Sequence, residues 1–206
     1  MKKINTYLTR EDASFALSKM QKFHEDLKCL MDKNGFNILD NLGRRNILLS
    51  SAQEKYFSDA LSRRFTVTCD GRTGEPDIVI ENLSKELECK LTSKHKSGAI
   101  SFQTDHDSLL KKQKLDFLYV VADRNFEKFA VVHYTDLTIK DFRPLSPGSR
   151  GKTQLKKYSA HDRANVLVGK MINLNKLNIE KLNHKISREK ITSKSKIKKI
   201  KNSISY

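Results

Sequence analysis

The first third of the chain has the apolar spacing of amphipathic helices. Apolar residues recur three and four positions apart between Ala16 and Leu30, and Thr9 stands as an N-cap before two acidic residues. This pattern predicts a helix that ends at the Asn34-Gly35 pair. A similar spacing predicts a second helix over residues 51–64.

From residue 76 onward the pattern changes to alternation of apolar and polar residues. Residues 76–81 and 86–92 alternate strictly, which predicts a strand hairpin with its turn at 82–85. The remaining expected elements are strands at 99–103, 117–122 and 129–134, a helix at 107–114 capped by Asp105 or Asp107, a loop at 143–152, and a short apolar segment of undetermined type at 164–174. This order favours an α/β fold with a mixed central β-sheet flanked by helices and followed by a basic C-terminal extension.

Charge changes the picture, because the chain carries a net charge of +16 that is unevenly spread. Residues 176–206 hold ten basic and two acidic residues, whereas residues 76–120 hold seven of each. The basic excess predicts a polyanionic partner, with nucleic acid ahead of an anionic membrane, and the neutral, acid-containing stretch is where we expect a metal site. No apolar run is long enough for a membrane span, and three cysteines without C-x-x-C spacing support neither a disulfide framework nor a zinc site.

Alternation in the hairpin brings candidate chemistry together. If its apolar residues face the core, Asp77, Glu88 and Lys90 converge on the opposite side. Two carboxylates with open positions suit Mg²⁺, and a lysine beside a bound water could orient it, stabilise developing charge or accept its proton. Glu86 shares the facing of Glu88, and only the E-x-K spacing favours Glu88. The bland alternative is a solvated hairpin with ordinary surface charges.

Pro76-Asp77, ten intervening residues and then Glu88-Cys89-Lys90 resemble the motif of the PD-(D/E)XK nuclease superfamily, and the resemblance covers roughly residues 50–135. It implies that Asp77, Glu88 and the Cys89 backbone carbonyl bind Mg²⁺, with Mn²⁺ able to substitute, and that Lys90 assists the attacking water. A helix glutamate often supports such sites, and Glu54 is the candidate. Ser51 to Glu54 equally reads as a capping box.

The resemblance also implies an organisation and a reaction. We expect an N-terminal helical region at 1–50, a nuclease core at 51–175 and a basic tail at 176–206. The implied activity is that of a type II restriction-like endonuclease that cuts double-stranded DNA as a homodimer and leaves 5′-phosphate ends. We expect a cytoplasmic protein that is prokaryotic or phage-encoded. The expected rivals are a structure-selective, repair or phage homing-type nuclease, and a non-catalytic basic nucleic-acid-binding protein.

Several residues are candidates for DNA contact. A basic loop can enter a groove, which points to Arg150 and Lys152, and the tail lysines Lys198 and Lys199 are expected to supply salt-sensitive affinity. The alternatives are that the loop is only a solvated connection and that residues 190–206 are solvated and disordered. Gln103 follows the motif strand where some family members carry a functional glutamine, although a structural or DNA-facing role is the stronger reading. His106, between two aspartates, is expected to be a solvent-facing residue at a helix start rather than a metal ligand.

Overall fold

Two long helices form from the first third of the chain. The computed structural model describes residues 6–69, 72, 75–93 and 100–169. Helix α1 (Arg10–Lys33) begins with a capping box, in which Thr9 Oγ1 accepts from Asp12 N at 3.1 Å and Asp12 Oδ2 accepts from Thr9 N at 2.9 Å. It ends at Asn34, followed by Gly35 in the left-handed region. The first predicted helix is therefore confirmed.

Helix α2 (Leu42–Leu61) begins well before the position expected from the sequence. Its N-cap is Asn41, whose side chain accepts from Arg44 N at 3.0 Å. The prediction of a start at Ser51 is wrong. The first turns of α2 carry polar residues that interrupt the apolar pattern, and one of them, Arg45, is fully buried. Residue 50, the expected end of a separate helical region, lies inside α2, and α1 packs on the same core as the sheet.

Six strands form the central sheet in the order β1-β2-β3-β5-β6-β8. Neighbours are antiparallel except for β3 and β5, which are parallel, so the predicted mixed sheet flanked by helices is confirmed. The strands are β1 (Val67–Thr68), β2 (Ile78–Ile80), β3 (Lys85–Ser93), β5 (Leu115–Ala122), β6 (Phe129–Leu137) and β8 (Asn165–Val168). β1 was not expected, and β8 gives a strand to the apolar segment that begins at residue 164.

A second, two-stranded sheet, here called the ribbon, joins β4 (Gln103–Asp105) to β7 (Lys152–Gln154). The strand expected at 99–103 is therefore wrong in its bounds and its sheet, because residues 100–102 have no regular structure and β4 pairs with β7 instead of the main sheet. Helix α3 (His106–Lys112) follows β4 directly and is capped by Asp105, and helix α4 (Lys157–Asp162) follows β7.

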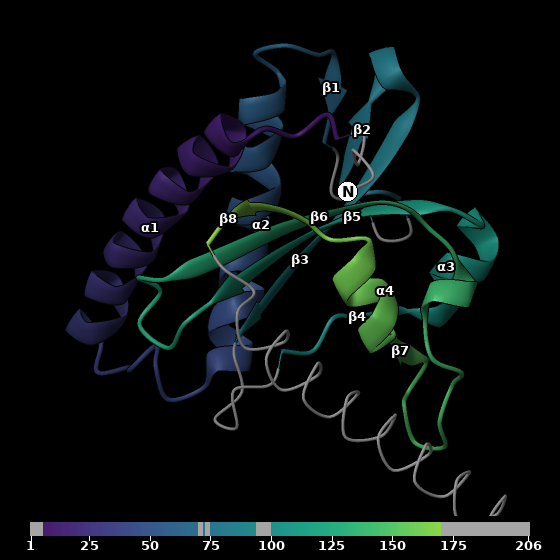
Figure 1. Ribbon diagram of the computed structural model, residues 1–206. Coiled ribbons are helices and arrows are strands. Elements are labelled where there is room, and N and C mark those ends of the chain that lie inside the picture. The colour runs from purple at the N-terminus through teal and green to yellow at the C-terminus, as the bar shows by residue number, and fades with distance from the viewer. Residues whose placement is uncertain (1–5, 70–71, 73–74, 94–99, 170–206) are drawn as a thin grey trace, which may run out of the picture. The chain divides into compact units, whose positions relative to one another are not determined.

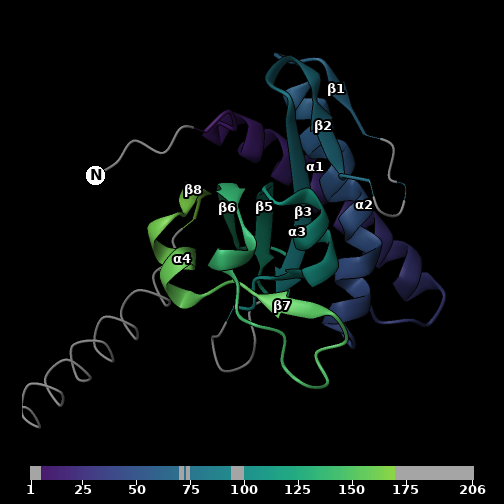
Figure 2. The same ribbon diagram turned by 90° about the vertical axis from the view of Figure 1, so that its right-hand side faces the viewer.

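The sheet has different cover on its two faces (Figures 1 and 2). On one face α1 and α2 pack on apolar residues that include Ile78, Leu87 and Leu118. On the other face lie the ribbon, α3 and α4, over aromatic side chains such as Tyr119, whose ring meets Phe102 with centroids 4.8 Å apart. Among the helices of the described ranges, none is long and apolar enough to cross a membrane.

Arg45 fixes α2 on the sheet through hydrogen bonds to backbone carbonyls and neutral side chains. Its guanidinium donates to the carbonyls of Asp123 and Arg124 at 3.1 and 2.5 Å in the β5–β6 turn, and to Ser93 Oγ at 2.8 Å at the end of β3. The ring of Phe126 lies 5.1 Å from the guanidinium carbon. One buried side chain thus ties the first turns of α2 to two parts of the sheet.

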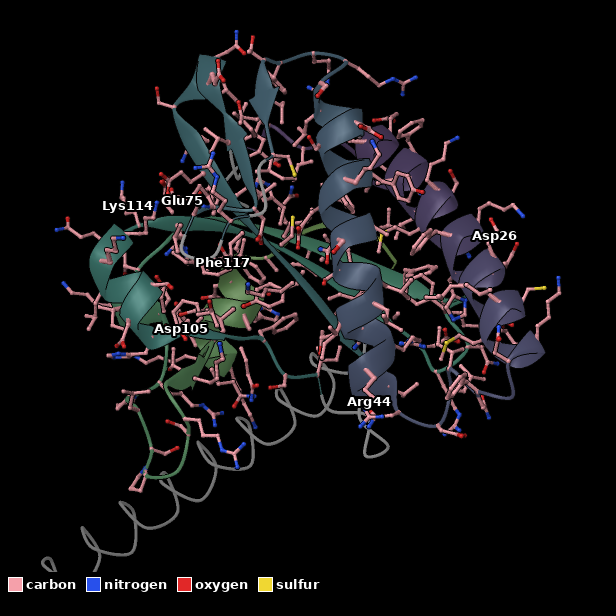
Figure 3. The ribbon with its side chains drawn as sticks, turned by 180° about the vertical axis from the view of Figure 1, so that it is seen from behind. Asp26, Arg44, Glu75, Asp105, Lys114 and Phe117 are labelled. Carbon is pink, nitrogen blue, oxygen red and sulfur yellow. The ribbon has the colours of Figure 1, made fainter. Side chains whose placement is uncertain are left out.

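Replacing Arg45 with methionine is expected to lower the free energy of unfolding by about 2 to 4 kcal/mol, because two backbone carbonyls lose their buried donor. Denaturant unfolding measures this change. Arg44 is the matched control, since it is exposed on the same helix turn (Figure 3), and Arg44→Met is expected to change stability by less than about 0.5 kcal/mol. Equal effects of the two substitutions would contradict the anchoring role of Arg45.

Candidate active site

The candidate site lies where β2 and β3 diverge. β2 pairs with β3 from Lys85 to Leu87. Beyond Leu87, β3 no longer pairs with β2 along this edge. Asp77, the residue just before β2, occupies the fork, and its Oδ2 accepts a hydrogen bond from Cys89 N at 2.6 Å. The N–H and C=O of one strand residue point to the same side, so the Cys89 carbonyl faces this edge too.

Alternation along β3 places the charged side chains as predicted. Leu87 and Cys89 are buried toward the helices, whereas Glu88 and Lys90 point to the opposite face of the sheet. Lys90 Nζ lies 2.5 Å from Glu88 Oε1, and both side chains are partly buried. The core-facing apolar residues of the hairpin therefore fix the facing of the charged pair.

Glu54 reaches the same site from α2. Its half-buried carboxyl lies in the field of Asp77 and Lys90, and burial together with the charge of Asp77 raises the pKa of Glu54 to about 6. The capping-box alternative is wrong, because Ser51 lies in the middle of α2 and the helix is capped at Asn41. The structure thus leaves Glu54 as a member of the charged cluster.

The cluster has an excess of negative charge. Burial and the neighbouring Glu88 raise the pKa of Asp77 to about 6. Burial pulls the pKa of Lys90 down, but the carboxylates of Glu88 and Asp77 outweigh burial and hold that pKa above its ordinary value. Lys90 is therefore a fixed cation, suited to stabilising or orienting negative charge and poorly suited to accepting a proton.

Two cavities adjoin the fork, one beside each neighbouring helix. The cavity beside α2 has a volume of about 390 Å³ and is lined by Gly43, Asn46, Ile47, Ser50, Glu54, Asp77, Cys89, Lys90 and Leu91. The cavity beside α3 has a volume of about 350 Å³ and is lined by Glu75, Pro76, Glu88, Asp107, Ser108, Lys111, Lys112 and Leu115. Figure 3 shows Glu75 close to α3. A substrate chain lying across the fork would have room on both sides of it.

The donors at the fork fit a hard divalent cation. The carboxylates of Asp77 and Glu88 and the Cys89 carbonyl are all oxygen ligands, and Mg²⁺ is commonly bound through one or two carboxylates with several waters. The raised pKa of Asp77 marks negative charge that a cation would relieve. Within the described ranges, no group of three or more His, Cys, Asp or Glu side chains is arranged to hold a metal ion. The candidate ligands at the fork are the carboxylates of Asp77 and Glu88 and the Cys89 carbonyl, and Glu88 is also the ion-pair partner of Lys90.

The other residues singled out from the sequence have different surroundings. Glu86 is paired with Lys112 of α3 at 2.8 Å, which leaves Glu88 as the acid beside Lys90. Gln103, Lys152 and the adjoining Arg150 come together on and beside the ribbon, next to α3. His106 is the first residue of α3, where its Nδ1 lies 3.4 Å from an Asp107 carboxylate oxygen. Lys198 and Lys199 lie outside the described residues.

Asn46 was missed by sequence reasoning. It lines the α2 cavity, and its Nδ2 donates to Ser93 Oγ at 3.0 Å while its Oδ1 accepts from Arg45 Nη2 at 3.1 Å. The sequence did contain one indication of this residue. Asn41 is a favourable N-cap, and a helix that begins there places Asn46 on the same face as Glu54.

The pH dependence of the free energy of unfolding is expected to reveal the repulsion between the Glu54 and Asp77 carboxylates. A pKa near 6 in the folded state exceeds the ordinary value, so the native protein binds more protons than the unfolded chain between about pH 4 and 6. The loss of stability caused by ionising these two carboxyls in the folded protein is therefore absent at low pH and complete above about pH 7. In EDTA, the double variant Glu54→Gln/Asp77→Asn is expected to melt above the wild type at pH 7.5, to lose about half of that advantage at pH 5 and to lose most of it at pH 4. A constant difference across this range would contradict the electrostatic picture.

Comparison of the chain with protein-family models and with curated proteins found no match. What can be said of its activity therefore rests on the geometry of the fork and on the residues that line it.

Proposed function

We propose that the protein is a metal-dependent DNA endonuclease with a restriction-endonuclease-like core. The observation that carries this proposal is the fork itself, where Asp77 and Glu88 lie beside the Lys90 ammonium and the sheet edge opens into two cavities. Glu54 adds a third carboxylate from the neighbouring helix. The order of α2, the hairpin, α3 and β5 agrees with the resemblance to PD-(D/E)XK nucleases.

Each side chain of the fork has a role that follows from its surroundings. Asp77 and Glu88 would hold Mg²⁺, which when bound neutralises phosphodiester charge and lowers the pKa of a water ligand. Lys90 stays protonated beside Glu88 and is placed to orient the attacking water and to stabilise charge that develops on the phosphate. Glu54 supports the site by adding negative charge on the α2 side.

The proposed substrate is double-stranded DNA, cut by in-line attack of water with 5′-phosphate and 3′-hydroxyl ends, by one active site per strand in a homodimer. A structure-selective or repair nuclease would use the same chemistry on branched substrates. Incubation with supercoiled plasmid and Mg²⁺ tests the proposal. We expect discrete nicked and linear products, whereas cleavage confined to branched duplexes would favour the structure-selective enzyme.

A basic nucleic-acid-binding protein without activity is the candidate of another class. It would retain plasmid binding, leave the plasmid intact and show no heat of Mg²⁺ binding in calorimetry. The proposal instead requires a Mg²⁺ binding signal that disappears in the Asp77→Asn variant.

A further inference from the structure

Exposed positive charge gathers beside the ribbon. A basic strip, defined as Lys140, Arg143, Arg150, Lys152, Lys156 and Lys157, is exposed at every one of its six positions. Asp141 is the one acidic residue between Lys140 and Lys157, and it accepts from Arg163 Nη1 at 2.8 Å. The segments of the strip are held together, because Lys156 Nζ donates to the Lys140 carbonyl at 2.6 Å and Arg143 N to the Gln154 carbonyl at 2.9 Å.

The ribbon turns its polar side chains outward. The central residues Thr104 and Thr153 are buried, so the residues on either side of each point away from the core. Gln103 stands opposite Gln154, and Asp105 stands opposite Lys152, with Lys152 Nζ 3.3 Å from Asp105 Oδ2. The outer face thus presents two amides and one ion pair, and Gln103 and Lys152 are exposed.

Glu88 and Lys90 point to one face of the main sheet, and the ribbon lies on that same face. Lys90 is the register partner of Tyr119, so both side chains point to the same face, and Tyr119 donates its hydroxyl to the Gln103 carbonyl at 3.1 Å. At its other end the ribbon meets α3, because Asp105 caps α3 and the Gly151 carbonyl accepts from His106 N at 2.9 Å. α3 in turn lines the cavity that contains Glu88, and Figure 3 shows Asp105 at this helix.

We propose that the ribbon enters the major groove of B-form duplex DNA, with Gln103 and Lys152 at the base edges and the other five residues of the basic strip on the adjoining phosphates. This inference rests on the proposed function and names the part of the chain that docks on its substrate. The major groove admits a two-stranded ribbon, and amide and lysine side chains read purine edges there. The exposed cations of the strip lie beside the ribbon, where a phosphate backbone borders the groove that the ribbon would enter.

The same geometry argues against the other polyanions. The deep, narrow major groove of A-form RNA does not admit side chains, and a single strand has no groove between two rows of phosphates. A protein that docks by this ribbon is therefore expected to prefer duplex DNA over an RNA duplex of the same sequence.

Binding in EDTA tests the ribbon without requiring cleavage. The probes are a labelled DNA duplex of about 30 base pairs, the same duplex with glucosylated 5-hydroxymethylcytosines that fill the major groove, and the matching RNA duplex. The full-length wild type is expected to bind the unmodified duplex at least about tenfold more tightly than either of the others. Equal binding of all three probes would overturn the inference.

A matched pair of double variants assigns the effect to the ribbon. Gln103→Ala/Lys152→Ala is expected to weaken binding to the unmodified duplex about tenfold and to leave binding to the glucosylated duplex unchanged. The control Gln21→Ala/Lys22→Ala removes the same residue types from α1, where Lys22 is paired with Asp26 far from Asp105 (Figure 3). It is expected to change neither affinity, and equal losses in both variants would overturn the assignment.

The salt dependence of DNA binding tests the basic strip separately from the ribbon. Arg143→Gln/Lys156→Gln/Lys157→Gln is expected to flatten the slope of log affinity against log salt by about 2 to 3, since each phosphate contact contributes about 0.9. The α1 control Lys19→Gln/Lys22→Gln/Lys28→Gln carries the same charge change and is expected to keep the wild-type slope. Equal slopes for the two triple variants would remove the strip from the interface. A protein that shows these binding patterns but never cuts DNA would overturn the proposed function and leave this inference standing.

Discussion

Asp77→Asn is expected to abolish Mg²⁺-dependent cleavage, with a loss of at least about a thousandfold in rate, because charge stabilisation by a bound metal contributes several kcal/mol. Asp77 is the residue that closes the fork between β2 and β3, and its carboxylate is the partner of the Cys89 amide at 2.6 Å. Asparagine keeps an oxygen that can accept this hydrogen bond but removes the negative charge. The substitution therefore separates the structural role of Asp77 from its proposed role at the metal.

The same variant is expected to be more stable than the wild type in EDTA at neutral pH. Burial and Glu88 raise the pKa of Asp77 to about 6, so its ionised form is disfavoured in the folded protein by about 1 to 3 kcal/mol. Loss of activity with gain of stability is the signature of a charge retained for function. A less stable protein would instead point to a structural role.

Asp26→Asn is the matched control for this pair of measurements. Asp26 is exposed on α1 and paired with Lys22. Its replacement is expected to leave the cleavage rate within about twofold and stability within about 0.5 kcal/mol. If Asp77→Asn kept more than about a tenth of the wild-type rate, Asp77 would not hold an essential metal.

Lys90→Ala is expected to lower the cleavage rate by about a hundredfold to a thousandfold while duplex binding stays within about threefold. Lys90 Nζ lies 2.5 Å from Glu88 Oε1, and the carboxylates of Glu54 and Asp77 also lie in its field. Its removal leaves the three acids without that charge and takes away the donor that the proposed function places beside the scissile phosphate. Single-turnover cleavage and binding in EDTA separate these two effects.

Two further variants test how specific this effect is. Lys55→Ala removes an exposed lysine paired with Asp59 on α2 and is expected to leave the rate unchanged. Lys90→Arg restores the charge with a different shape and is expected to recover part of the activity. Full activity of Lys90→Ala would refute its role in the reaction.

The facing of the candidate site residues was predictable because side chains alternate between the two faces of a β-strand. Ile78, Leu87 and Cys89 have to face the core, and this requirement alone sends Glu88 and Lys90 to the other face. Asp77 could be placed beside them because the hairpin is short and antiparallel. The sequence thus contained the facing of the three charged residues, although not the hydrogen bond from Cys89 N.

The elements that were missed depend on contacts that no local pattern reveals. The first turns of α2 are polar because Arg45 is buried among carbonyl groups contributed by residues about eighty positions away. The strand at Gln103–Asp105 is too short to show a period, and its partner at Lys152–Gln154 follows a loop that contains two prolines. Both errors arise from pairing between distant segments, which propensity and periodicity do not encode.

The most direct test of the central claim compares wild type and Asp77→Asn, purified in parallel, on supercoiled plasmid with Mg²⁺, followed by chemical analysis of the cut ends. The account predicts that the wild type cuts the plasmid, leaves 5′-phosphate ends and stops in EDTA, and that Asp77→Asn binds the plasmid without cutting it. Cutting by both proteins, or an intact plasmid with the wild type in either Mg²⁺ or Mn²⁺, would contradict it.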